Sequence, residues 1–188
     1  MKVKGQVRYS SYEQWISRLV FAEDQATLYT EGFVVLSNHP FIRRQLTLLE
    51  TETNRHSRSS VSIFERAESN QPEFIERAEL EVSAEMALVV DMRRVVRYCD
   101  ESIVSAAIRL QEYLVEQYIR ACARLRHSSS TEVSDRMTQI LSCKRARLDA
   151  LRRCLSDLAS DNRAPVALER PNKRAFAGAI RSYLAGNH

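Results

Sequence analysis

The residues best suited to catalysis or metal binding are the histidines and cysteines, of which the chain has four each. The histidines are His39, His56, His127 and His188, and the cysteines are Cys99, Cys122, Cys143 and Cys154. No histidine stands in the HExxH or ExxH spacing that places two metal ligands on one helix face. No cysteine belongs to a CxxC pair. Because all four cysteines fall in apolar helical patterns, we expect buried free thiols, with disulfide or metal chemistry as the alternative.

Motifs that bind phosphate or carry a nucleophile are also missing from the sequence. It contains no GxxxxGKS or GxxxxGKT, no GxGxxG and no GxSxG, and only four glycines. Tight active-site turns usually need glycine, because glycine alone reaches positive φ cheaply. Carboxylates abound between Glu65 and Glu85, but their spacing is that of a solvated or partner-facing helix surface, with a catalytic or cation site as the alternative. We therefore expect a protein that is not an enzyme and that uses no cofactor and no metal.

Charge is distributed unevenly along the chain, whose net charge is +4. Residues 61–92 carry a net charge of −6, from eight acidic and two basic residues. Residues 93–188 carry a net charge of +8, from eighteen basic and ten acidic residues. Arginine supplies 24 of the 28 basic residues of the whole chain, and it pairs bidentately with carboxylate or phosphate. A coding bias is the other explanation of this excess.

The basic stretches 144–147 and 152–153 have two interpretations. They are either the flanks of a packed helix, where long basic side chains cover apolar edges, or contacts to phosphate. We favour the flanks, because no aromatic residues interleave with the arginines to stack on bases.

The first seventy residues predict a ribbon, helices and a loop. Residues 2–9 alternate and residues 33–36 form a strand-like run, so we expect a minor N-terminal β-ribbon, with a frayed terminus as the alternative. A capping box at Ser10 begins an amphipathic helix that is expected to end at about Leu28. A second helix begins at Pro40. The polar stretch 51–60 shows no core-facing residue and is predicted to be a loop, followed by a short helix over 61–68.

Ninety-two consecutive residues between Pro72 and Pro165 contain neither glycine nor proline, the two strongest breakers of helices. Apolar residues follow steps of three and four through residues 73–126, and Glu85 fills one place in this stripe. The pattern predicts either one long helix or two nearly collinear helices, with Asp100 capping the second.

A second apolar stripe, which we call the seam, has heptad spacing. The seam consists of Met137, Leu141, Lys144, Leu148, Leu151, Leu155 and Leu158. Such a pattern is typical of a packed pair of helices, and a polar residue within it costs stability while fixing register or partner number. We expect the seam to join copies of the chain in an oligomer. We also expect Lys144→Leu to raise thermal stability. The helix is predicted to begin at a cap on Ser129 and to stop by Asn162.

Residues 163–188 are expected to form a proline-bounded linker and a basic amphipathic helix. Its candidate partner-binding residues are Phe176, Ile180, Tyr183, Arg174 and Arg181. A short basic helix on a tether is a common docking device. The alternative is a helix that folds back on the chain's own core.

These patterns predict an all-α protein, a helical bundle built on long antiparallel, coiled-coil-like helices. We expect a helical domain over residues 1–162 and the tethered segment after it. No apolar run approaches the length of a membrane span, and we expect a cytoplasmic protein in a reducing compartment. The expected function is that of a self-associating adaptor or scaffold that binds other proteins. The alternative is a regulatory or packaging protein that binds nucleic acid through the arginine-rich C-terminal half.

Overall fold

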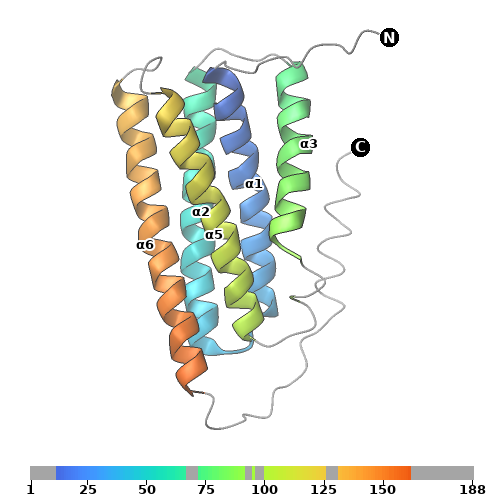
Figure 1. The fold of residues 1–188 in the computed structure, drawn as a ribbon, viewed down its shortest axis with the longest axis vertical. Helices are drawn as coiled ribbons and strands as arrows, with labels where there is room; N and C mark the ends of the chain where they lie inside the picture. The colour runs from blue at the N-terminus through green and yellow to red at the C-terminus, as the bar shows by residue number, and fades with distance from the viewer. Residues whose placement is uncertain (1–11, 67–71, 92–94, 96–99, 126–130, 162–188) are drawn as a thin grey trace.

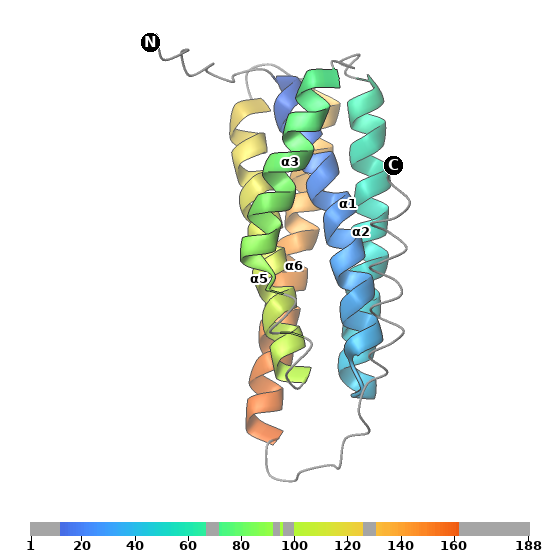
Figure 2. The ribbon, with the colours of Figure 1, turned by 90° about the vertical axis from the view of Figure 1, so that its right-hand side faces the viewer.

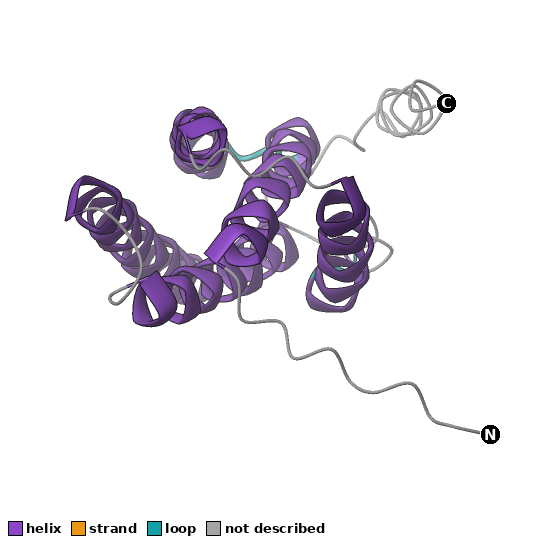
Figure 3. Ribbon diagram, turned by 90° about the horizontal axis from the view of Figure 1, so that it is seen from above, coloured by secondary structure: helices purple, strands orange, loops and turns teal. Residues whose placement is uncertain are grey.

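The computed structural model describes residues 12–66, 72–91, 95, 100–125 and 131–161. Within these ranges the chain forms five long helices and no strand (Figure 3). They are α1 (Tyr12–Leu36), α2 (Pro40–Arg66), α3 (Pro72–Val89), α5 (Asp100–Leu125) and α6 (Thr131–Asp161). The prediction of an all-α bundle is therefore confirmed for this part of the chain. Residues 2–9 and 163–188, which carried the predicted first ribbon strand and the C-terminal helix, lie outside the described ranges.

The helices run side by side and alternate in direction (Figure 1). α1 packs against α2, and α5 packs against α6, as two antiparallel hairpins. α3 lies between them in sequence and runs back down the bundle, so that α2 and α5 point the same way. Figure 2 faces α3, which stands on the outside of the bundle and contacts α1 and α5. The arrangement is a bundle of two hairpins joined by one long helical crossover.

Two apolar clusters hold the helices together. The larger cluster takes side chains from all five helices, among them Phe33, Leu46, Met86, Leu110 and Leu151. The smaller cluster closes the end of the bundle at which α1 begins, and it includes Ile16, Leu19, Met137, Ile140 and Leu141. Burying a large apolar side chain contributes about 1.5–3 kcal/mol, so these clusters supply the main force that orders the bundle.

α1 is longer than the sequence predicted. The expected strand at residues 33–36 is wrong, because these residues form the last turn of α1, and the helix continues through Gly32. A glycine costs about 1 kcal/mol inside a helix, but Phe33 is fully buried. Burial of that side chain offsets the cost of the glycine.

α2 is also longer than predicted, and the expected loop at residues 51–60 is wrong. α2 continues to Arg66 and absorbs most of the separate short helix expected over residues 61–68. Thr53, His56 and Ser60 are buried, at the spacing of one helix face. A pattern that counts only apolar residues missed this core-facing side, because its members are polar.

The stretch 73–126 is interrupted after α3. α3 ends at Val89, Val90 and Asp91 are not helical, and α5 begins at Asp100. The reading as one continuous helix is therefore wrong, and so is the reading as two nearly collinear helices, because α5 runs antiparallel to α3 (Figure 1). Asp100 also accepts a hydrogen bond of 2.7 Å from the Ser37 hydroxyl. This bond ties the first turn of α5 to the end of α1.

Candidate functional site

An ion pair lies in the middle of the bundle. The Lys144 ammonium on α6 lies 2.7 Å from Oε1 and 2.9 Å from Oε2 of Glu23 on α1. Both side chains are almost wholly buried, with exposed fractions of 2% and 0%. The Tyr118 hydroxyl on α5 donates a 2.8 Å hydrogen bond to Glu23, and Ser60 on α2 lies 3.1 Å from that hydroxyl. Three helices thus meet at one buried carboxylate, and α2 joins them through the contact of Ser60 with Tyr118.

The carboxylate oxygens of Glu23 in this network are already bonded to other side chains of the protein. Burial, and then the charge of Glu23, raise the pKa of Tyr118 well above its ordinary value, so the phenol stays protonated and donates. Lys144 and Tyr118 occupy the carboxylate oxygens of Glu23, which leaves it poorly placed to act as a base on a substrate. In the described part of the chain, no group of three or more His, Cys, Asp and Glu side chains is arranged to hold a metal ion. The hydrogen bonds and the ion pair of this network join residues of different helices.

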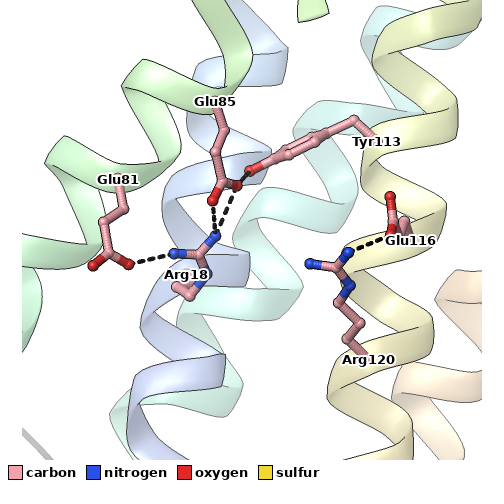
Figure 4. Close-up of polar contacts among 6 residues, drawn as sticks. All are labelled: Arg18, Glu81, Glu85, Tyr113, Glu116 and Arg120. Carbon is pink, nitrogen blue, oxygen red and sulfur yellow. Dashed lines mark hydrogen bonds and ion pairs between the residues drawn. The ribbon is translucent and has the colours of Figure 1, made fainter. Parts of the chain in front are cut away.

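A second network attaches α3 to the bundle (Figure 4). Arg18 on α1 donates a 2.6 Å hydrogen bond to Glu81 and two bonds of 2.7 Å to Glu85. The Tyr113 hydroxyl on α5 donates to Glu85 at 2.7 Å. Burial alone would raise the pKa of Glu85, but the bonds from Arg18 and Tyr113 lower it overall. Glu85 occupies a place in an apolar stripe because it meets a cation and a phenol there.

Replacing Arg18 with leucine tests this attachment. We expect the free energy of unfolding to fall by about 1–2 kcal/mol, because Glu85 then faces Tyr113 without its cation. We also expect faster amide hydrogen exchange in α3, measured by mass spectrometry. The matched control is Arg152→Leu, since Arg152 pairs with Glu112 on the exposed surface away from this network and such pairs contribute under about 1 kcal/mol. Unchanged exchange in α3 for Arg18→Leu would show that the apolar contacts alone hold α3.

The outer side of α3 exposes large apolar side chains. Leu80 is 73% exposed and Leu88 is 86% exposed, and Ala84 and Ala87 beside them are exposed too. We call these four residues the α3 outer face. Because residues four apart lie above one another on a helix, they form a continuous apolar stripe. The opposite side of α3 is buried in the bundle, so this helix is apolar on both sides.

The surroundings of the α3 outer face are acidic and indented. Glu76 and Glu79 are exposed one turn away. Next to Leu88 lies a hollow of about 480 Å³ between α3 and α5, lined also by Tyr113, Arg109 and Glu116. Arg109 donates a hydrogen bond of 3.1 Å to the carbonyl of Val89, which fixes the wall of the hollow. An exposed apolar stripe with a polar rim is typical of a protein-binding surface.

The seam residues lie inside the chain's own bundle. Met137, Leu141, Lys144, Leu148 and Leu151 are buried, and Leu155 and Leu158 are partly buried against the larger cluster. α6 packs mainly against α5 and α2, and Lys144 also pairs with Glu23 on α1. The role of the seam in joining copies stays a prediction. The predicted partner-binding residues Phe176, Ile180, Tyr183, Arg174 and Arg181 lie outside the described ranges.

Sequence reasoning missed three residues that matter in these networks. Glu23 stands in the apolar stripe of α1 between Leu19 and Ala26, as Lys144 stands in the seam, so it carried a readable signal. Tyr118 and Arg18 look like ordinary members of amphipathic helices, and only the structure shows their partners.

No protein-family model matches the chain, and neither a curated protein nor a solved structure matches it. None of the described helices combines the length and the apolar character that crossing a membrane requires.

Proposed function

We propose that this protein is a non-enzymatic helical adaptor or scaffold that self-associates through the α3 outer face. The observation that carries the proposal is the exposure of Leu80 and Leu88. Leaving these two leucines in water is unfavourable, since burying each contributes about 1.5–3 kcal/mol. α3 is already anchored to the bundle by its other side and by Arg18, so it presents this stripe as a fixed surface.

The occupant that we propose is the basic C-terminal segment, residues 163–188, of another copy. That segment carries five basic residues and one acidic residue, and its apolar positions include Phe176, Ile180 and Tyr183. α3 carries five glutamates and one arginine. Opposite charge around matching apolar stripes favours this pairing, and binding of an amphipathic helix to an exposed apolar face is a recurring mode of recognition.

Light scattering coupled to size exclusion tests the proposal. We expect the full chain to form an oligomer, and both Leu80→Ser with Leu88→Ser and Phe176→Ala with Ile180→Ala to give monomers. Leu48→Ser is the matched control, because Leu48 is an exposed leucine on α2 and its loss should leave the oligomer intact. A monomeric full chain, or an oligomer that survives both double substitutions, contradicts the proposal. A monomer in which the segment contacts α3 of its own chain would also contradict it.

The alternative, nucleic-acid binding through the arginine-rich half, has weaker support. Two arginines of the basic stretches are engaged within the bundle, since Arg147 pairs with Glu52 and Arg152 pairs with Glu112. These contacts favour the interpretation of the stretches as flanks of a packed helix. We further propose an intracellular, reducing location, because Cys122, Cys143 and Cys154 are free thiols.

A further inference from the structure

A groove lies between α2 and α6, on a side of the bundle that the proposed function does not use. It consists of two adjoining hollows of about 560 Å³ and about 670 Å³, within the size range of small-molecule sites. Both hollows are lined by Arg55, Ser59 and Arg136. The first hollow adds Arg58 and only neutral polar side chains to these three. This end of the groove therefore gathers three guanidinium groups and no carboxylate.

The arginines of the groove form no ion pair among the described residues, although Glu132 and Asp135 line the second hollow together with Arg55 and Arg136. Within the described ranges, neither Arg55 nor Arg58 forms an ion pair or a hydrogen bond with another side chain. Arg136 makes a long contact of 3.5 Å with the Ser59 hydroxyl. Arg147, which also joins α6 to α2, differs in that Glu52 holds it with two hydrogen bonds. The first hollow of the groove therefore carries positive charge, which favours the binding of an anion.

His56 lines the second hollow and has a ring nitrogen without a hydrogen-bond partner. Its side chain is only 4% exposed, yet its Nδ1 has no hydrogen-bond partner among the described residues. A buried polar atom without a partner costs about 1–3 kcal/mol, and native structures usually satisfy such atoms. Glu132, Asp135 and Gln139 line the same hollow. The Nδ1 atom has almost no accessible surface, so this end of the groove offers a ligand the carboxylate and amide acceptors of these three residues.

We propose that the α2–α6 groove binds a small phosphate monoester that carries hydroxyl or amino groups. Arg55, Arg58, Arg136 and the Ser59 hydroxyl donate to the phosphate oxygens, as guanidinium groups do in other phosphate sites. Glu132 and Asp135, which line the second hollow, accept from the hydroxyl or amino groups of the ligand, and the ring of His56 beside them reports binding. The proposal rests on the groove alone and is independent of self-association.

Nuclear magnetic resonance of the full chain tests the site, with glycerol 3-phosphate, inorganic phosphate and glycerol as probes. We expect glycerol 3-phosphate to shift the ring signals of His56 in a saturable way, inorganic phosphate to bind more weakly, and glycerol to have no effect. Arg136→Ala should weaken the binding of glycerol 3-phosphate at least about tenfold, which is about 1.4 kcal/mol. Arg44→Ala and Arg153→Ala are matched controls, because both are exposed arginines on the same two helices outside the groove.

Two results would overturn the proposal. The first is the absence of any shift of the His56 ring signals at glycerol 3-phosphate concentrations up to about 10 mM. That result would mean an affinity weaker than a specific site of this size provides. The second is equal weakening by Arg136→Ala and by either control, which would show binding to positive charge in general. A duplex oligonucleotide is titrated in parallel. If it binds while both phosphate probes leave His56 unmoved, the arginines serve a polyanion and the groove proposal fails.

Discussion

Replacing Lys144 with leucine should lower the free energy of unfolding by about 3–5 kcal/mol. The substitution removes the only cation that the structure places on Glu23 among the described residues, and it leaves that carboxylate fully buried. Breaking a buried ion pair by removing one partner strands a charge in the core, which costs far more than the ion pair itself contributes. Urea unfolding followed by circular dichroism measures the loss.

A double-mutant cycle distinguishes the stranded charge from lost packing. Glu23→Leu alone should also destabilise the protein, whereas Glu23→Leu together with Lys144→Leu should recover most of the loss, because no buried charge remains. Arg120→Leu is the control for removing an exposed cation. A Lys144→Leu variant as stable as the native protein would mean that Lys144 does not pair with Glu23. From the heptad pattern we expected Lys144→Leu to raise thermal stability. The ion pair with Glu23 leads us to expect the opposite.

Acidification should destabilise the protein through His56. Burial, and then the positive charges of Lys144 and Arg55, lower the pKa of His56 to about 3, whereas an unfolded histidine titrates near 6.5. Between these two values the unfolded chain binds a proton that the folded chain does not bind. Stability from the neutral imidazole is therefore complete above about pH 6.5 and declines as the pH falls toward about 3.

The size of this loss of stability depends on how far nearby carboxylates and water weaken the effect of burial on His56. The full linkage is about 1.4 kcal/mol for each pH unit. We expect about half of it, because Glu132 and Asp135 line the same hollow and water screens the charges there. The free energy of unfolding should fall by about 1–2 kcal/mol between pH 6.5 and pH 4.5. His56→Gln, which does not titrate, is the comparison, and the same decline in both proteins would exclude His56 as its source.

The helices that the sequence predicted best are those whose cores are apolar. α6 has apolar residues at heptad spacing, a serine-rich turn before it and no internal breaker, and the structure gives it nearly the expected ends. α2 could not be predicted in the same way. Its second half faces the core with Thr53, His56 and Ser60, and a hydrophobicity pattern reads such residues as exposed. Ser60 lies beside the Tyr118 hydroxyl of another helix, and Thr53 donates to the Leu49 carbonyl of its own helix.

The sequence predicted the candidate sites only in part. Lys144 stood out because it interrupts the apolar seam, but its partner Glu23 lies 121 residues away, and local patterns carry no such distances. Leu80, Ala84 and Leu88 stand at four-residue spacing and formed a second apolar stripe on α3 that the sequence displayed. α3 turns one of its two stripes toward the bundle, where its glutamates meet Arg18. The position of Arg18 is known only from the three-dimensional arrangement.

The separation of Glu23 from Lys144 also has a consequence in time. A ribosome adds about 5–20 residues per second, so about 6–24 s pass between the synthesis of Glu23 and the synthesis of the residue that neutralises it, 121 positions later. If the hairpin of α1 and α2 forms during that interval, its Glu23 carboxylate has no ammonium beside it. Water must fill that place, because a lone charge does not enter an apolar interior. α6 therefore completes the bundle by expelling water from its centre, and the first hairpin reaches its final dry packing only when the last helix arrives.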